Sequence, residues 1–196
     1  MIFPDYKETG LVYHVAPIID LDEIINKGIK YDDKITYTTK YKAFHRYIDS
    51  FKKDFIPSWV IREKTIFASL NFNNGHTWHS HTVIMGIKIN EDKCWIANEN
   101  LANEIYEPFI LKDIKSFEVA RDYLNKKGSK ILEKYWNTSL SFKENLQLRR
   151  DKTKGYDAEV LIQHDILKED IKLIAITSDH KIMSIKEWKS FLSKGE

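Results

Sequence analysis

The order of strand-like and helix-like segments limits this chain to a few fold classes. Short runs of β-branched and aromatic residues predict strands, and they come singly or in groups between amphipathic stretches. Regular alternation of strand and helix would favour a doubly wound parallel sheet, whereas this irregular order predicts an α+β fold. The strands are expected at 10–17, 64–72, 81–90, 94–98, 158–166 and 171–177, with 90–93 as a hairpin-like turn.

Apolar residues three or four positions apart predict the helices, and capping residues predict where they begin and end. Asp20 is expected to cap the first helix and Gly28 to end it, while Pro57 ends the second. Gly128 is expected to break the fourth helix, and Ser184 to cap the last. The helices are expected at 20–29, 40–55, 99–110, 116–139 and 184–194.

The length and composition indicate a globular chain without a targeting or membrane segment. No Pro-, Gly- or Ser-rich linker divides the 196 residues, so we expect a single domain over 1–196. No apolar run approaches the roughly 18 residues of a membrane span, and "MIFPDYKETG" lacks the features of a secretory signal. The single cysteine, Cys94, excludes an intramolecular disulfide. We therefore expect a cytoplasmic protein that does not associate with a membrane.

The stretch "GHTWHSH" (75–81) carries three histidines, His76, His79 and His81. A catalytic zinc site needs about three protein ligands, and imidazole is a good one. On an extended chain His79 and His81 share a face while His76 is out of phase, and no carboxylate lies within the stretch. A polar loop, which could cover a ligand, is the favoured interpretation, and no metal is expected.

Two polar residues, His14 and Glu159, lie inside apolar strands. The sequence of each strand alone does not show whether the residue has a structural or a functional role. Burying an unpaired carboxylate costs several kcal/mol, so Glu159 is either a residue that meets water or an acid held for chemistry. His14 is likewise either an ordinary strand residue or a hydrogen-bonding partner for a ligand. Alternation places Glu159, Leu161 and Gln163 on one face and Ala158, Val160 and Ile162 on the other.

Basic residues gather in two runs, although the net charge of +2 is too small to argue for nucleic-acid binding. One run lies at 40–55 and the other at 146–155. Over 143–157 there are five basic residues against three acidic ones, a net of +2. Both runs are open to the simpler interpretation of a solvated face, and the second leads directly into the strand that carries Glu159.

Two segments, taken together, resemble a known family. "YHVAPIIDLDEIINKGI" (13–29) resembles the first motif of the ADP-ribosyltransferase superfamily, and "DAEVLIQHDILKEDIKLIAI" (157–176) resembles the final motif. The closest likeness is to the branch that includes DarT-type DNA ADP-ribosyltransferases and tRNA 2′-phosphotransferases. The two motifs cover about a fifth of the chain. The resemblance implies an ADP-ribosyltransferase-like split central β-sheet flanked by helices, with NAD as co-substrate.

The resemblance also assigns residues to NAD binding. His14 would hydrogen-bond the ribose on the nicotinamide side of NAD, and Tyr13 would help to shape that pocket. "IPSWVIREKTIFAS" (56–69) is similar to the second motif, in which Ser69 would hold nicotinamide and Phe67 would supply an aromatic ring.

By the same resemblance Glu159 would be the catalytic acid beside the ribose. Displacement of nicotinamide passes through an oxocarbenium-like state, and a carboxylate stabilises its positive charge. Arg62 is the expected supporting arginine, with Arg46 in reserve. The arginine-modifying members carry Glu or Gln two residues before the final Glu, whereas this chain has Asp157 there, which argues against transfer to protein arginine.

The acceptor is expected at the loop that enters this last strand, where cationic residues could contact phosphates and an aromatic ring could stack on a base. A nucleic acid is slightly favoured over a protein, in a toxin- or defence-like enzyme with an antitoxin or immunity partner. The alternatives are an NAD-dependent RNA 2′-phosphotransferase and a non-catalytic NAD- or nucleotide-binding module. The acceptor-binding candidates are Arg149, Arg150, Lys152, Lys154 and Tyr156.

Overall fold

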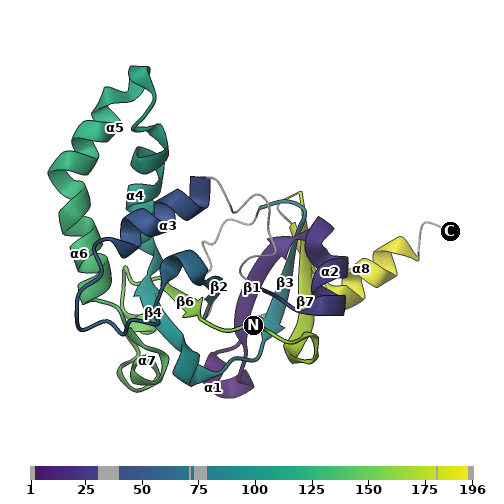
Figure 1. Ribbon diagram of the computed structural model, residues 1–196. Coiled ribbons are helices and arrows are strands. Elements are labelled where there is room, and N and C mark those ends of the chain that lie inside the picture. Colours follow the sequence, from purple (N-terminus) through teal and green to yellow (C-terminus); the bar gives the residue numbers. More distant parts are fainter. Residues whose placement is uncertain (1–2, 31–39, 71, 73–78, 180, 194–196) are drawn as a thin grey trace. The chain divides into compact units, whose positions relative to one another are not determined.

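The computed structural model describes residues 3–30, 40–70, 72, 79–179 and 181–193 (Figure 1). The chain divides into two compact units. Unit 1 comprises Met1–Lys30, Phe67–Asn90 and Asp165–Glu196, and unit 2 comprises Tyr31–Ile66 and Glu91–His164. Each unit combines separate stretches of the chain, and a single domain over 1–196 stays a prediction. Helices and antiparallel strand pairs occur in both units, which confirms the predicted α+β class.

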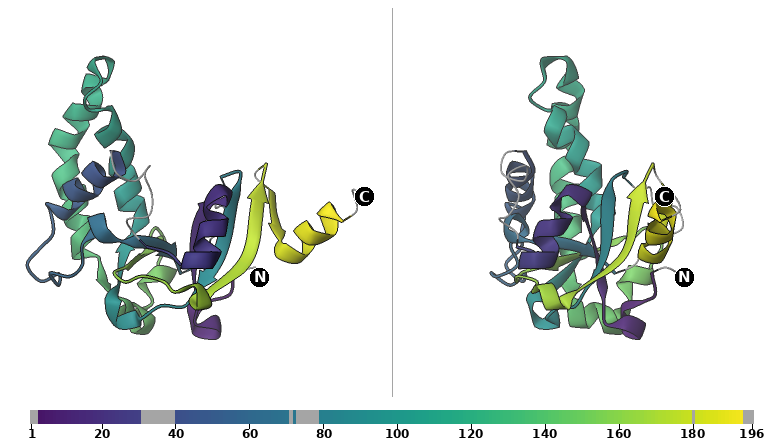
Figure 2. Two further views of the ribbon diagram at one scale, coloured as in Figure 1. Left: turned by 45° about the vertical axis from the view of Figure 1, so that its right-hand side comes forward. Right: turned by 90° about the vertical axis from the view of Figure 1, so that its right-hand side faces the viewer.

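Unit 1 is built on antiparallel strands in the order β2–β1–β3–β7–β8. The central pair is in register from Val12 opposite Ile87 to Pro17 opposite Thr82. Figure 2 shows α2 and α8 on opposite sides of these strands. The strands are β1 (Val12–Pro17), β2 (Ile66–Ser69, whose first residue belongs to unit 2), β3 (Thr82–Ile87), β7 (Ile171–Ser178) and β8 (Lys181–Ser184). The helices are α1 (Tyr6–Thr9), α2 (Leu21–Lys27) and α8 (Ile185–Leu192).

The helix of the first motif ends where the sequence predicted, at Gly28. Gly28 has a φ of 87°, which L side chains rarely adopt. The next residue, Ile29, exchanges backbone hydrogen bonds of 2.9 and 3.0 Å with Ile166. A Cβ on Gly28 would lie 2.1 Å from the carbonyl oxygen of Ile166, so only glycine allows this close approach.

Unit 2 places a three-stranded antiparallel arrangement, in the order β5–β4–β6, among five α-helices within the described residues. Its interior includes Tyr135 and Trp136, both 0% exposed, and the indole of Trp136 donates to the Ile48 carbonyl at 2.9 Å. The strands are β4 (Cys94–Asn98), β5 (Leu140–Ser141) and β6 (Ala158–Ile162). The helices are α3 (Lys40–Asp49), α4 (Glu99–Leu111), α5 (Glu118–Tyr123), α6 (Ser129–Asn137) and α7 (Phe142–Leu148).

Three predicted boundaries are wrong. Helix α3 ends at Asp49, well before Pro57, and the Asp49 carboxylate accepts the backbone N–H groups of Arg62 and Glu63, each at 3.0 Å. Gly128 does not break its helix, since α5 and α6 are joined by a π-helical turn over Leu124–Gly128 (Figure 1). The segment 90–93 is not a hairpin turn, because β3 pairs with β1 and β7 while β4 pairs with β5 and β6.

Local signals account for the elements that the sequence placed correctly. Ser184 caps α8 in a full capping box with Glu187, as predicted. Strand β4 spans the predicted 94–98. The sequence missed four short elements, namely α1, β5, α7 and β8. None of the helices in the described part of the chain combines the length and the apolar character that a membrane span requires.

Candidate functional site

Glu159 lies in the interior of unit 2, on strand β6. It stands directly opposite Ala97 of β4 and is 5% exposed. Every residue from Glu159 to Ile162 is buried, so neither face of this strand meets water. The structure therefore excludes the interpretation of Glu159 as an edge-strand residue in contact with solvent.

The partners of Glu159 are Arg62 and Tyr135. Arg62, at the start of a 3₁₀ turn over Arg62–Lys64, is 4% exposed and donates from Nη1 to both Glu159 Oε1 and the Tyr135 hydroxyl. The Tyr135 hydroxyl in turn donates to Glu159 Oε1 at 2.8 Å. A buried ion pair is tolerated when further hydrogen bonds satisfy its polar atoms, and Tyr135 supplies one here.

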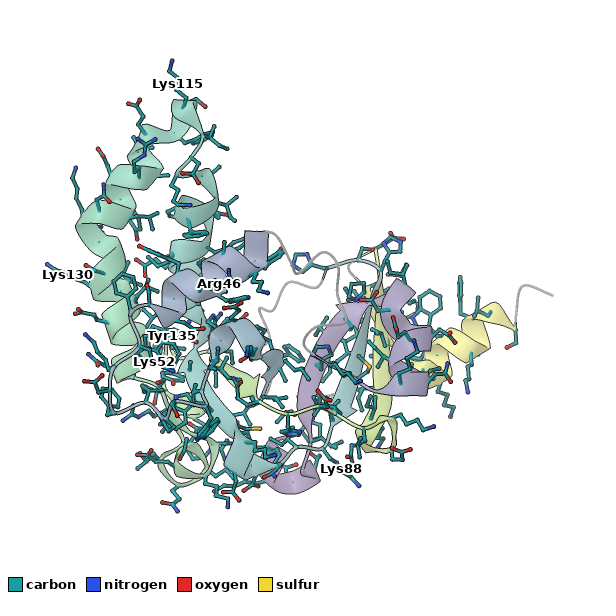
Figure 3. All side chains as sticks on the ribbon, viewed as in Figure 1. Arg46, Lys52, Lys88, Lys115, Lys130 and Tyr135 are labelled. Atoms are coloured by element: carbon teal, nitrogen blue, oxygen red, sulfur yellow. The ribbon has the colours of Figure 1, made fainter. Side chains whose placement is uncertain are left out.

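His45 completes this buried group, which we call the carboxylate cluster (Arg62, Glu159, Tyr135 and His45). Arg62 Nε donates to His45 Nδ1 at 3.1 Å, so that nitrogen accepts and the imidazole is neutral. Burial, and then the Arg62 charge, lower the pKa of His45 to about 2. Burial also raises the pKa of Tyr135 well above its usual value, which keeps its hydroxyl as a donor to Glu159. Figure 3 shows Tyr135 inside unit 2, whereas Lys130 on the same helix points outward.

The backbone of Arg62 is also held by a hydrogen bond, because the Asp49 carboxylate at the end of α3 accepts its N–H. Burial raises the pKa of Asp49, although these backbone hydrogen bonds and Arg62 act in the opposite direction. Arg46, the reserve candidate, lies outside the cluster. It forms an ion pair with Glu63 at 2.8 Å, and its own side chain is 62% exposed.

The hydrogen bonds to Glu159 within the described residues all reach one oxygen, Oε1. Among the described residues, these bonds hold the carboxylate through Oε1. A second acid, Glu99, acts on the same site. It is the first residue of α4, it is half-buried, and burial followed by the charge of Glu159 raises its pKa to about 7.

Sequence reasoning missed Tyr135, His45 and Glu99. Tyr135 lies in an ordinary amphipathic helix and carries no local signal. His45 could have been noticed, because it follows Phe44 on the apolar side of α3 and both are buried. Glu99 occupies the first turn of a helix, where acidic residues are common, so its position gave no sign of a second role.

The four residues predicted to bind NAD lie in unit 1, on β1 and β2. His14 is buried, and its Nδ1 lies 2.7 Å from the Phe67 carbonyl oxygen, so Nδ1 carries the proton and Nε2 is the acceptor. Tyr13 stands opposite Ser69, and strand alternation puts Phe67 on that same face. His14 therefore points to the other face of these strands from Tyr13, Ser69 and Phe67.

Tyr13 has structural partners on its own face. Its hydroxyl donates to the Pro4 carbonyl at 2.7 Å, and its ring packs edge-on against Phe3 with centroids 5.2 Å apart. Ser69 and Phe67 are both half-buried. Of the four residues predicted to line one NAD pocket, the structure thus groups three on one face and His14 on the opposite one.

Two of the five predicted acceptor-binding residues are held by interactions within unit 2. Arg149 has a left-handed backbone (φ 52°) and forms an ion pair with the buried Asp151 at 2.8 Å. Asp151 also accepts from Asn145 at 3.0 Å. Arg150 Nη1 donates to the Thr138 carbonyl at 3.0 Å. Both arginines therefore shape the loop that enters β6.

The other three candidates divide by exposure. Tyr156 is 8% exposed, and its hydroxyl donates to the Thr138 carbonyl at 3.0 Å. Its ring is enclosed by unit 2, so the predicted stacking of Tyr156 on a splayed base does not fit this structure. Lys152 and Lys154 are exposed, and their ammonium groups lie on the surface where phosphates could reach them.

The histidine stretch yields no metal centre among the residues that the structure describes. His79 and His81 are exposed, and His76 lies outside the described residues. Within the described ranges, no three His, Cys, Asp or Glu side chains come together in a way that could hold a metal ion.

Comparison of the chain with protein-family models, with curated proteins and with solved structures found no match. The functional argument therefore rests on the motifs of the sequence and on the carboxylate cluster.

Proposed function

We propose that this protein is an NAD-dependent mono-ADP-ribosyltransferase with an ADP-ribosyltransferase-like fold, and that Glu159 is its catalytic acid. The observation that carries the proposal is the way Glu159 is held. A buried carboxylate on the strand of the final motif is bonded at Oε1 by Arg62 and Tyr135. Arg62 is the arginine that the resemblance assigns to the site, and it is found in contact with the catalytic candidate.

The chemistry of the transfer explains why a carboxylate should be held in this way. As nicotinamide leaves, positive charge develops on the ribose, and a preorganised anion stabilises it without having to reorient. The surrounding interior strengthens this interaction, because charges attract more strongly where water is excluded. Arg62 and the Tyr135 hydroxyl hold Glu159 through Oε1, and in the proposed reaction Oε2 faces the ribose.

The remaining assignments depend on the resemblance. NAD is the co-substrate, and His14 is assigned to its ribose. A nucleic acid is the favoured acceptor because Lys152 and Lys154 are exposed on the loop before β6 and could contact phosphates. This contact would position the acceptor without reading its sequence.

The experiment is release of nicotinamide from labelled NAD in the presence of single-stranded DNA, RNA or cellular protein. We expect a stable ADP-ribosyl adduct on nucleic acid. Glu159→Gln should abolish transfer, whereas the matched control Glu169→Gln, at an exposed position, should retain it. Wild-type rates in Glu159→Gln would refute the assignment of Glu159.

Loss of activity counts only if the variant folds. Removing one charge of a buried ion pair typically costs about 3–5 kcal/mol. Glu159→Asp retains the charge and shortens the side chain, so it should fold better and still lose most of the transfer. Thermal unfolding of both variants measures this. NAD binding without nicotinamide release would indicate a binding module, and a cyclic phosphate product would indicate RNA 2′-phosphate removal.

A further inference from the structure

Glu99 and Glu159 face the same side of adjoining strands in unit 2. Ala97 stands directly opposite Glu159, and Asn98 stands opposite Ala158. The backbone is still extended at Asn98 (φ −88°, ψ 104°), so Glu99, two residues after Ala97, returns to the side of Glu159. Diagonal neighbours in an antiparallel pair have Cβ atoms within about 8 Å, which long side chains can span.

The backbone fixes Glu99 in this place. Its N–H donates to the Asp157 carbonyl at 2.8 Å, which extends the β4–β6 pairing into the first residue of α4. Glu99 is half-buried while Glu159 is buried, so Glu99 is the more accessible of the two carboxylates.

The two acids differ in their hydrogen-bond partners and in the charges around them. Glu159 is bonded by Arg62 and Tyr135 through Oε1. For Glu99, burial and the negative charges of Glu159 and Asp157 favour the protonated form. Arg62 and a hydrogen bond with Asn103 oppose them, and together these influences raise the pKa of Glu99 to about 7.

The transfer reaction has two tasks for such groups. One is to place negative charge beside the developing positive charge, and the other is to take up the proton of the acceptor. An acid that has given up its proton near neutral pH is suited to the second role, because general bases work best with a pKa near the working pH. Glu159, held by Arg62, is suited to the first.

Resting on the proposed function, we propose that Glu99 is the general base that accepts the proton of the acceptor. In this step the bond between ribose C1′ and the nicotinamide nitrogen breaks, and its electron pair neutralises the pyridinium. A lone pair on the acceptor's N–H or O–H group forms the new bond to C1′. The proton of that group passes to the Glu99 carboxylate and then to water, so atoms and charge balance.

The assignment predicts a pH profile. Only ionised Glu99 accepts a proton, so kcat/KM should rise about tenfold per pH unit below about 7 and level off above it. Glu99→Gln should lower kcat/KM at about pH 8 roughly a hundred- to ten-thousand-fold and remove that rising limb. The matched control is Glu107→Gln, an exposed acid on the same helix, which should keep both rate and profile.

A merely structural role would not give two further results. Added formate should partly restore transfer in Glu99→Ala, because a small carboxylate can enter the space and accept the proton. Nicotinamide release to water alone should depend less on Glu99 than transfer to the acceptor does. An unchanged pH profile in folded Glu99→Gln, or no rescue by formate, would overturn the assignment.

The titration of Glu99 can be followed without any reaction. In protein with isotope-labelled glutamates, one carboxyl resonance should titrate near 7 and be absent from Glu99→Gln. If that resonance is found but wild type releases no nicotinamide, the proposed function fails and the base role falls with it. If wild type transfers ADP-ribose but no such resonance exists, only the assignment of Glu99 is overturned.

Discussion

The hydroxyl of Tyr135 gives the sharpest test of the carboxylate cluster. It accepts from Arg62 and donates to Glu159 at 2.8 Å, in a side chain that is 0% exposed. Tyr135→Phe removes that one oxygen and leaves the ring, and therefore the packing, in place. The measured effect then reports the hydrogen bonds alone.

The expected loss follows from these contacts. A hydrogen bond to a charged group contributes about 1.5–3 kcal/mol, and this hydroxyl has two charged partners. Arg62 and Glu159 remain paired with each other in the variant, so the charges are not left isolated. Because this pairing remains, we expect the loss to equal about one such hydrogen bond. Tyr135→Phe should therefore lower the free energy of unfolding by about 1.5–3 kcal/mol.

Urea denaturation followed by tryptophan fluorescence measures this loss, since Trp136 next to it in sequence is fully buried. Tyr123→Phe is the matched control, because the Tyr123 hydroxyl also donates to a carboxylate, Glu104, at 2.7 Å but at the surface. The control should lose less than about 0.5 kcal/mol. If the two variants lose equal stability, the buried Tyr135 hydroxyl contributes no more than a hydroxyl at the surface.

The remaining predictions concern pH and backbone conformation. His45 has a pKa of about 2 when folded and 6.5 as an ordinary side chain, so below 6.5 the unfolded chain binds a proton that the folded one does not. Stability should fall by about 1.4 kcal/mol per pH unit as pH drops below 6.5, and urea titrations of His45→Gln should show a shallower slope. Gly28→Ala should cost about 2–4 kcal/mol, because it adds left-handed strain to a collision with Ile166. Gly10→Ala, with a φ of 67° and nothing within 4 Å of its Cβ, should cost only about 1 kcal/mol, and equal losses in thermal unfolding would contradict the collision.

The sequence predicted the candidate acid and arginine through motifs, but not how they are held. Glu159 and Arg62 were both named, and they meet in the interior of unit 2. The interpretation of Tyr156 as a stacking residue failed, because an aromatic residue in a basic loop looks the same whether its ring is exposed or enclosed. The residues predicted to bind NAD are also divided between two faces, because alternation along β1 places His14 and Tyr13 on opposite sides of the strand.

The sequence by itself determined those features of the fold that depend only on residues close together in the chain. Ser184 and Glu187 cap α8 within one turn, and Gly28 follows the last residue of α2 with a positive φ that glycine adopts readily. Such signals depend on interactions over three or four residues, which the sequence displays directly.

The tertiary structure alone decided the surroundings of the candidate acid. Tyr135 lies 24 residues from Glu159 along the chain, and Arg62 lies 97 residues away, yet both contact the same oxygen. No local pattern specifies that meeting, because it depends on how a helix, a 3₁₀ turn and a strand pack together in unit 2. Packing is also what enclosed Glu159, and an enclosed carboxylate must be paired, which is why its partners are Arg62 and Tyr135 and not water.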